Sequence, residues 1–236
     1  MVYVRAVAPL ALLYDVHGNL PALEVVVADA RAAGAETFVL GGDYALFGAW
    51  PAETVALLRS LSGATWIRGN VDRWTAAPAD APDNELVQGA IAACRDALDP
   101  RLVDELGALQ EQVVIAGTRY CHASPLSDLR SFMPEPTDDE AELLDGVAER
   151  RLVFGHTHLP FRRVAASGTE LVNPGSVGMP FDGDQRAAYA LLHDDDRIEH
   201  RRVEYDFQAS ADAVRQRFGE APWIETVVRR ITTARF

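Results

Sequence analysis

The sequence predicts an α/β fold built from two sheets with helices on the outside. In the first third of the chain, apolar strand-like runs alternate with helix-like runs. The later part contains strand-like runs separated by tight turns, and the last stretch has a helical pattern. Alternating strands and helices favour a buried, largely parallel sheet, whereas strands joined by short turns favour antiparallel pairing.

The predicted elements of the first third follow the order β-α-β-α-β. The apolar run AVAPLALLY is a strand. The segment NLPALEVVVADARAAG is a helix with Asn19 as N-cap, Pro21 in the first turn and Gly34 past its end. ETFVLGG is the second strand, PAETVALLRSLS is a helix that opens on Pro51, and ATWIRGN is the third strand.

The pattern changes after this segment. Residues 76–100 become helical around NELVQGAIAACRDAL, and EQVVIAGTRYCHAS is a predicted hairpin that turns at AGT. RLVFGH, FRRVAASGTELVN and AAYALLHDDDRIEHRRVEYDF supply further strands, the last two joined at DDD, and their alternation predicts antiparallel pairing. SADAVRQRFGE and PWIETVVRRITTARF are predicted helices, and residues 1–236 are treated as a single domain.

Composition narrows the class of protein. The net charge of −13 would repel a polyanion such as duplex nucleic acid. No apolar run approaches the roughly 20 residues of a membrane span, and the first apolar run lacks the features of a signal peptide. Cys94 and Cys121 lie far apart and form no motif, which favours a reduced, cytoplasmic protein. We therefore expect no duplex nucleic acid and no membrane as partner, while oligomeric state is left open.

Polar side chains gather at five predicted strand ends. These strands end in YDVHGN, GGDY, RGNVD, CHASP and GHTHLP, each with Asp, His or Asn beside a glycine or proline turn. Loops at the carboxyl ends of parallel strands converge, so we expect one cluster. Its members are Asp15, His17, Asp43, Asn70, His122, His156 and His158. On extended backbone, Asp-x-His and His-x-His would each place both side chains on one face.

This set of side chains suits two divalent metal ions. A carboxylate can bridge two cations, neutral imidazoles suit Mn, Fe, Zn or Ni, and Asn adds an oxygen without charge. Each motif alone is weak, but their joint order at strand ends predicts a dinuclear centre, for which we favour Mn²⁺. His156 and His158 would then bind one ion each, whereas His193 and His200 flank an acidic turn and are expected at the surface.

The order of these motifs resembles the calcineurin-like metallophosphoesterases. The matching segments are DVHGN (15–19), GGD (41–43), GNVD (69–72), CHASP (121–125) and GHTHLP (155–160). HGNLPAL (17–23) and NPGSVGMP (173–180) are similar to a small prokaryotic branch that includes bacterial phosphodiesterases and relatives of diadenosine tetraphosphatase. The resemblance covers about residues 8–192 and leaves a helical extension, about 208–236, outside it. It implies a four-layer α/β/β/α sandwich of two mixed sheets flanked by helices.

The resemblance also implies how the ligands divide. Asp15, His17 and His158 would hold one metal, Asn70, His122 and His156 the other, and Asp43 would bridge them. A hydroxide bridging the metals would attack phosphorus in line with the leaving oxygen. Asp43 and Asn70 would thus contribute to catalysis through the metals.

Val71 departs from the family pattern. Many relatives carry His there, as Gly-Asn-His-Asp or Gly-Asn-His-Glu, where it is held to protonate the leaving group or stabilise the transition state. Valine transfers no proton, so part of the roughly 10²–10⁴-fold that a placed acid contributes should be lost. We therefore expect a preference for activated phosphodiesters, such as aryl esters or pyrophosphate-type bonds, with Asp72 or a water as the alternative acid. Tyr14 stands where many relatives have Ser or Thr, and we expect it in the core.

Other residues near these motifs are candidates for substrate contact. Arg68 and Arg73 flank the Asn70 motif and either bind substrate phosphate or are solvated at the surface. Asn173 and Ser176 either fix the NPGSVGMP loop or donate to substrate. An apolar wall for a base or aryl group, or ordinary core packing, would use Trp50, Phe161, Met179 and Phe181.

The sequence thus predicts a dinuclear-metal-dependent phosphoesterase acting on a small phosphoester, in the first place a phosphodiesterase that hydrolyses P–O bonds. A dinucleoside polyphosphate hydrolase and a protein Ser/Thr phosphatase are the enzymatic alternatives. The non-enzymatic alternative is a catalytically idle metal-bound scaffold. The presence of competent residues at all seven ligand positions argues against that scaffold.

Overall fold

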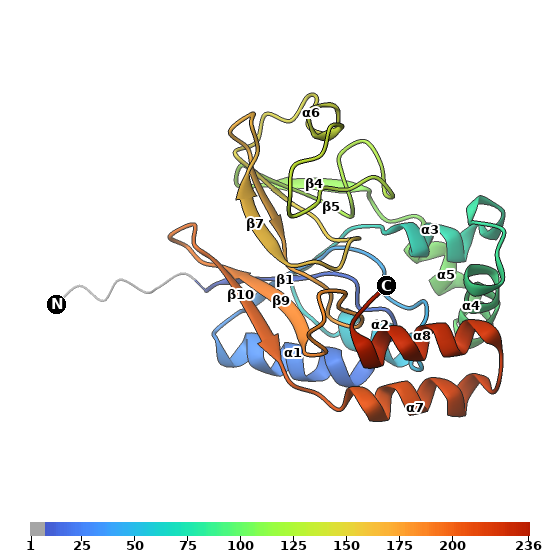
Figure 1. Cartoon of the computed structure of the whole chain (residues 1–236). Helices are drawn as coiled ribbons and strands as arrows, with labels where there is room; N and C mark the ends of the chain where they lie inside the picture. The colour runs from blue at the N-terminus through green and yellow to red at the C-terminus, as the bar shows by residue number, and fades with distance from the viewer. Residues whose placement is uncertain (1–7) are drawn as a thin grey trace.

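The computed structural model describes residues 8–236, in which two five-stranded sheets lie face to face with helices outside them (Figure 1). Sheet A has the strand order β10-β9-β1-β2-β3, and sheet B has the order β4-β5-β6-β8-β7. Both sheets contain parallel and antiparallel pairs. The predicted sandwich of two mixed sheets is therefore confirmed.

Sheet A contains the β-α-β-α-β segment that the sequence predicts. Its strands are β1 (Leu10–Leu13), β2 (Thr37–Leu40), β3 (Ala64–Trp66), β9 (Ala187–Leu192) and β10 (Ile198–Val203). The crossover helices are α1 (Leu20–Ala32) and α2 (Pro51–Arg59), and β1, β2 and β3 run parallel. Asn19 caps α1 as predicted, because its side chain accepts the backbone N–H of Ala22 at 3.4 Å.

Sheet B begins with the predicted hairpin, which is formed by its first two strands. Its strands are β4 (Gln112–Ile115), β5 (Thr118–Cys121), β6 (Arg151–Val153), β7 (Phe161–Val164) and β8 (Glu170–Asn173). The pairs β4–β5 and β7–β8 are antiparallel, as expected. The expectation of antiparallel pairing is wrong for β6, which runs parallel to both β5 and β8. Residues 122–150 form a long connection, which allows β6 to run in the same direction as β5.

The other helices lie outside the sheets. They are α3 (Asn70–Ala76), α4 (Glu85–Ala97), α5 (Pro100–Gly107), α6 (Glu140–Leu143), α7 (Phe207–Phe218) and α8 (Pro222–Thr233), with a short 3-10 helix at Pro78–Asp80. The helices α7 and α8 form the predicted C-terminal extension. Their buried side chains, including Val214, Trp223 and Val227, join the apolar core that α1 shares with sheet A. The extension therefore belongs to the helical layer that covers sheet A (Figure 1).

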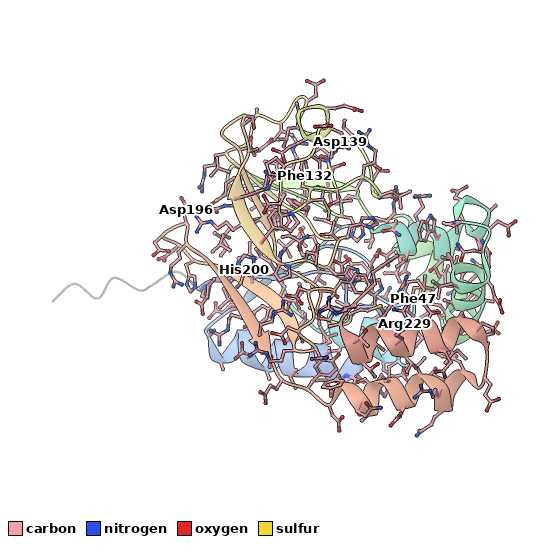
Figure 2. The ribbon with its side chains drawn as sticks, in the orientation of Figure 1. Phe47, Phe132, Asp139, Asp196, His200 and Arg229 are labelled. Atoms are coloured by element: carbon pink, nitrogen blue, oxygen red, sulfur yellow. The ribbon has the colours of Figure 1, made fainter. Side chains whose placement is uncertain are left out.

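Side chains along β1 alternate between two apolar cores. Leu13 points toward the helices, whereas Leu12 and Tyr14 point into the space between the sheets, where Val153 of β6 belongs to the same core. Tyr14 is fully buried, so its predicted place in the core is confirmed. A third core, which contains Phe132 (Figure 2), lies outside sheet B beneath the segment that carries α6.

Several smaller sequence features can be located in the fold. Cys94 and Cys121 are free thiols buried in different cores. His193 pairs with Glu199 at 2.8 Å, and His200 on β10 (Figure 2) contacts a backbone carbonyl of β8 at 2.8 Å. Within residues 8–236, we find no helix that combines the length and the apolar character needed to cross a membrane.

Candidate metal centre

The seven predicted ligands come together where the two sheets end. The segments that follow β1, β2 and β3 carry four of them, with Asn70 as the first residue of α3, and the loops after β5 and β6 carry the other three. Six are almost fully buried, and His156 is partly exposed. The parallel pairs within each sheet explain this convergence, because parallel strands bring their carboxyl ends to the same edge.

The first group of donors surrounds Asp15. Its Oδ1 lies 3.5 Å from Nε2 of His158, and that nitrogen lies 3.1 Å from Nε2 of His17. Oδ1 of Asp15 is buried and has no hydrogen-bond partner among residues 8–236, which is unfavourable for a carboxylate oxygen. One oxygen and two ring nitrogens thus share a space that suits a divalent cation.

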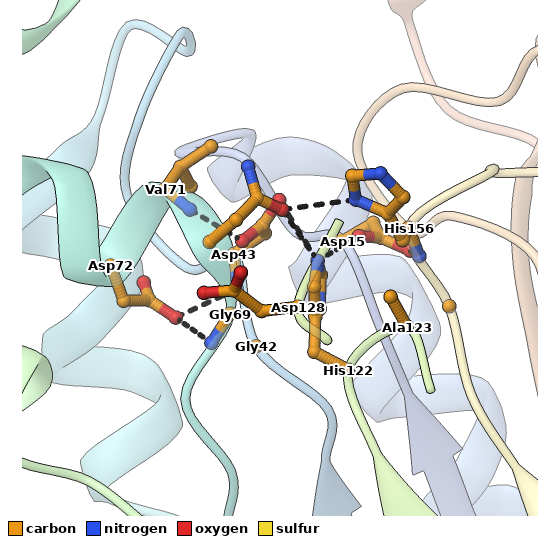
Figure 3. A network of polar contacts seen from close by, with 12 residues as sticks. Asp15, Gly42, Asp43, Gly69, Val71, Asp72, His122, Ala123, Asp128 and His156 are labelled. Carbon is orange, nitrogen blue, oxygen red and sulfur yellow. Dashed lines mark hydrogen bonds and ion pairs between the residues drawn. The ribbon is translucent and has the colours of Figure 1, made fainter. Parts of the chain in front are cut away.

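The second group surrounds His122 (Figure 3). Its Nε2 lies 2.9 Å from Oδ1 of Asn70, and Nδ1 of His156 lies 3.0 Å from the same oxygen. Nε2 of His122 also lies 3.4 Å from Oδ2 of Asp43 and 3.9 Å from Oδ1 of Asp15. Two imidazoles, an amide oxygen and carboxylate oxygens therefore face a second shared space.

Asp43 lies between the two groups. Its Oδ2 is 3.8 Å from Nε2 of His17 in the first group and 3.4 Å from Nε2 of His122 in the second. Its Oδ1 accepts a hydrogen bond from the backbone N–H of Val71 at 3.1 Å. A carboxylate in this position faces both spaces, as a bridging ligand must.

Backbone carbonyls orient the three most buried rings. Nδ1 of His17 contacts the carbonyl of Leu46 at 3.2 Å, and Nδ1 of His158 contacts the carbonyl of Met179. Nδ1 of His122 contacts another carbonyl at 2.8 Å. A carbonyl only accepts, so each Nδ1 donates, and the lone pair of a neutral ring is left on the Nε2 that faces the shared space. Outer hydrogen bonds of this kind are typical of metal-binding histidines, so the residues fit the two predicted cations.

Burial and neighbouring charge set the proton affinities of these groups. Burial lowers the pKa of His17 and of His156 to about 4, because an imidazolium is poorly solvated there. Burial also opposes the charged form of His122, but the carboxylates of Asp43 and Asp15 outweigh it and raise the pKa to about 10. Without a cation, a proton on His122 offsets the carboxylate charge, and metal binding would release it.

Five of the seven side chains extend from left-handed backbone. The φ angles are 54° for Asp15, 50° for His17, 60° for Asp43, 66° for His156 and 58° for His158. The expectation that the two His motifs lie on extended backbone is therefore wrong. Non-glycine residues rarely adopt positive φ, and such conformations cost about 1–3 kcal/mol each and cluster at functional sites. Sharp turns at Asp15 and His17 bring both side chains into the first group of donors, whereas those at His156 and His158 direct the two rings to different groups.

Asp72 ties two of these loops to each other. Its carboxylate accepts the backbone N–H groups of Asp43 at 2.9 Å and Gly69 at 2.8 Å (Figure 3). It also accepts the backbone N–H of Tyr44 at 3.1 Å. A Cβ on Gly69 would lie 2.0 Å from Oδ1 of Asp43, so this close approach requires glycine. Burial and the charge of Asp43 raise the pKa of Asp72 to about 7. Because both carboxylate oxygens are engaged with the backbone, the geometry gives Asp72 a positioning role and disfavours it as the alternative acid.

The two predicted arginines already have partners. Arg73 forms a two-point ion pair with Asp128, at 2.7 and 2.9 Å, and Arg68 pairs with Glu111. Both arginines line a cavity of about 280 Å³ that borders His122. They are therefore near the centre, but their charges are offset by carboxylates.

The polar residues of the NPGSVGMP loop also bond to the protein. The amide of Asn173 donates to the carbonyl of Gly155 at 3.1 Å and to Oγ1 of Thr157 at 3.0 Å. The hydroxyl of Ser176 donates to the carbonyl of Asp15 at 2.7 Å. Neither Asn173 nor Ser176 has exposed surface, so of the two roles considered for them the geometry supports fixing the ligand loops.

A second cavity, of about 370 Å³, opens beside the ligands and is mostly apolar. Met179 and Phe181 line it, in agreement with the predicted apolar wall, whereas Trp50 and Phe161 pack against separate cores instead. Sequence reasoning did not identify the rest of its lining, which includes Phe47, Trp74, Leu86, Leu129, Arg230 and Phe236.

The sequence did contain one signal for this cavity. The apolar positions of α8 include Trp223, Val227 and Ile231, which recur at helical spacing and are buried. Arg230 falls on the same buried stripe. A charged residue within an apolar stripe calls for a specific explanation.

Comparisons with known proteins agree with this architecture. A family model described as the calcineurin-like phosphoesterase superfamily domain matches residues 9–197. The uncharacterized protein MJ0912 of Methanocaldococcus jannaschii is 29% identical over 230 residues, which cover 87% of this chain and 91% of that protein.

Solved structures with a similar fold include a metallophosphoesterase, in agreement with the family match. A metallophosphoesterase from Sphaerobacter thermophilus matches with a TM-score of 0.81 at 26% identity, over 96% of this chain and 99% of that chain. The hypothetical protein PH1004 from Pyrococcus horikoshii OT3 also has a TM-score of 0.81, at 18% identity over 94% and 98% of the two chains, and therefore shows a common fold. The family match contains all seven candidate ligands and ends before α7 and α8.

Proposed function

Because this chain belongs to the calcineurin-like phosphoesterase superfamily, we propose that it is a dinuclear-metal-dependent phosphodiesterase that hydrolyses small phosphoesters. The observation that carries the proposal is the convergence of seven donor side chains from the segments that follow five strands. The unpartnered Oδ1 of Asp15 and the inward-facing ring nitrogens are explained if cations complete the site.

We assign the ligands to two positions. Asp15, His17 and His158 would hold one cation, Asn70, His122 and His156 would hold the other, and Asp43 would contact both. When bound, two divalent cations supply a water-derived nucleophile at neutral pH and offset the charge of the phosphoryl oxygens. The chain itself fixes the donors through the outer hydrogen bonds of the rings, and it removes bulk water by burying them.

The environment of Val71 supports a preference for esters with good leaving groups. Val71 borders the apolar cavity and is 3% exposed, and the neighbouring Asp72 is held by three backbone N–H groups. Val71 has no transferable proton, and the contacts of Asp72 disfavour proton delivery from its carboxyl group to a leaving oxygen. A phosphodiester whose leaving group is already acidic needs no such proton, so we propose activated diesters as substrates.

Metal identity and cellular setting are part of the same proposal. We favour Mn²⁺, although a mixed set of nitrogen and oxygen ligands also suits Fe, Zn or Ni. The net charge of −13 favours a small phosphoester over duplex nucleic acid as substrate. Two buried free thiols support a cytoplasmic location.

Elemental analysis paired with a substrate screen tests this function. The purified protein, reconstituted with Mn²⁺, should contain two metal ions per chain. It should hydrolyse a bis-aryl phosphate faster than an aryl monophosphate, diadenosine tetraphosphate or a phosphopeptide. A protein that holds both ions and turns over none of the four would instead be an idle scaffold, and fastest hydrolysis of diadenosine tetraphosphate or of the phosphopeptide would reassign the substrate.

A further inference from the structure

Arg230 is a buried arginine whose charge is not neutralised by any carboxylate within the described residues. Its side chain is 8% exposed, and within residues 8–236 it has no ion pair or hydrogen bond, its Nε being fully enclosed. The other buried arginine, Arg151, pairs with Glu170. The chain has 35 acidic residues against 22 basic ones, so carboxylates that could neutralise Arg230 are abundant elsewhere in the protein.

Helix α8 brings Arg230 into the apolar cavity beside the metal ligands. The cavity is lined by His17, Asp43 and His158 and also by Arg230. The guanidinium carbon lies 4.2 Å from the ring centroid of Phe236 and 5.8 Å from that of Phe181. Phe181 in turn stacks on the ring of His158, with centroids 4.3 Å apart. A short chain of stacked groups thus connects the cation to the ligand set.

The surroundings of Arg230 suit an anionic ligand. Its guanidinium is poorly solvated because it is buried, and this burial lowers its pKa. Its cavity is walled by apolar side chains such as Phe47, Trp74 and Leu86, and these neutralise no charge. An unpaired buried charge is costly, and an anion entering the cavity would remove that cost. The planar N–H fork of arginine also matches two phosphate oxygens at once.

We propose that Arg230 binds the anionic phosphoryl oxygens of the substrate, and that the apolar wall of the same cavity receives the organic group of the ester. The substrate class is then a small phosphoester with an apolar or planar group. This inference rests on the proposed function for the identity of the ester, whereas the anion site itself is testable by binding alone. Arg230 lies beyond the matched family segment, so the C-terminal extension contributes directly to the site.

Binding of inorganic phosphate to the Mn²⁺-loaded protein tests the anion site. A hydrogen bond to a charged group contributes about 1.5–3 kcal/mol, so Arg230→Gln should weaken phosphate binding by about 10- to 150-fold in isothermal calorimetry. Arg230→Lys keeps the charge without the fork and should fall between Arg230→Gln and the unmodified protein. Arg101→Gln is the matched control, because Arg101 is an exposed arginine on α5 that carries the same charge and does not line the cavity. It should change the Kd less than twofold.

The inference is overturned if Arg230→Gln binds phosphate as tightly as the unmodified protein, or if the metal-loaded protein binds no phosphate. A purely structural role would lower the thermal midpoint and leave the phosphate Kd unchanged. We expect the phosphate Kd to rise and the thermal midpoint not to fall, since the substitution removes a buried charge that has no ion pair. Should Arg230→Gln fail to fold, Arg230→Met keeps the apolar stem without the charge and is measured in its place.

Kinetics on a bis-aryl phosphate separate this inference from the proposed function. If Arg230→Gln raises KM at least tenfold while Arg101→Gln does not, both are supported. If the unmodified protein hydrolyses the ester and Arg230→Gln leaves kcat and KM unchanged, the inference fails and the proposed function stands. If no phosphoester is hydrolysed but phosphate affinity still depends on Arg230, the proposed function fails and the anion site stands.

Discussion

Replacing Asp72 by alanine should destabilise the protein and disturb the metal centre together. The Asp72 carboxylate accepts three backbone N–H groups, from Asp43, Tyr44 and Gly69, at 2.8 to 3.1 Å. It is 3% exposed, so water does not readily replace it. Two of these donors belong to the loop that presents Asp43 between the two groups of ligands.

The expected loss in the free energy of unfolding follows from the number of backbone N–H donors left without an acceptor. A buried donor without an acceptor costs about 1–3 kcal/mol, so three donors give about 3–9 kcal/mol. Burial raises the pKa of Asp72, because it disfavours the charged carboxylate. Replacing Asp72 by alanine removes this unfavourable burial of charge and so offsets part of the loss. We therefore expect the lower end, about 3 kcal/mol. Asp72→Asn keeps one oxygen acceptor but places an NH₂ donor against a backbone N–H, and should lose less, about 1–3 kcal/mol.

Urea unfolding of the metal-free proteins, followed by circular dichroism, measures these losses. Metal titration of the same variants should show affinity weakened by about 10- to 100-fold, as for other residues that orient metal ligands. Asp83→Ala is the matched control, because Asp83 is an exposed aspartate in the turn before α4. If Asp72→Ala unfolds at the same urea concentration as Asp83→Ala and binds metal normally, the assigned positioning role is wrong.

Three further predictions follow from the same geometry. Asp43→Ala should lower the metal content and reduce turnover by at least about 10²–10³-fold, since it removes the carboxylate that faces both groups of ligands, and unchanged turnover would contradict a dinuclear centre. Across a series of aryl phosphodiesters, the rate should fall steeply as the pKa of the leaving group rises, because Val71 supplies no proton, whereas a flat series would reveal another acid. Hydrogen bonds from Arg201 and Tyr189 lower the pKa of Asp29 below its ordinary value of about 3.9. These bonds stabilise the folded protein by about 1 kcal/mol at pH values above that ordinary pKa. The stabilisation is lost as the pH falls through the lowered pKa. The urea midpoint of Asp29→Asn should accordingly lie below that of the unmodified protein at pH 7 and converge with it in acid, and a pH-independent difference would refute this assignment.

The sequence was sufficient to predict the strands and most of the helices near the site. Apolar runs that end in turns marked β1, β2 and β3, and the Asn19 cap marked the start of α1. These signals are local, because they depend on side-chain periodicity and on hydrogen bonds between residues close in the chain. The short helix α3 was missed because it begins at Asn70, which was assigned to the end of the predicted strand ATWIRGN.

The sequence by itself determined which donors are available, since the types and order of Asp, His and Asn at strand ends already indicated a metal centre. Only the tertiary structure decided how they are presented. Left-handed backbone at Asp15 and His156 depends on hydrogen bonds to loops far away in the chain, such as the bond from the N–H of His156 to Asp15 at 3.0 Å. The same holds for Arg230, whose place beside the ligands depends on α8 packing against the rest of the protein. The periodicity of apolar residues shows that one face of a helix is buried. Contacts between segments distant in the chain decide which element buries that face and whether a cavity remains between them.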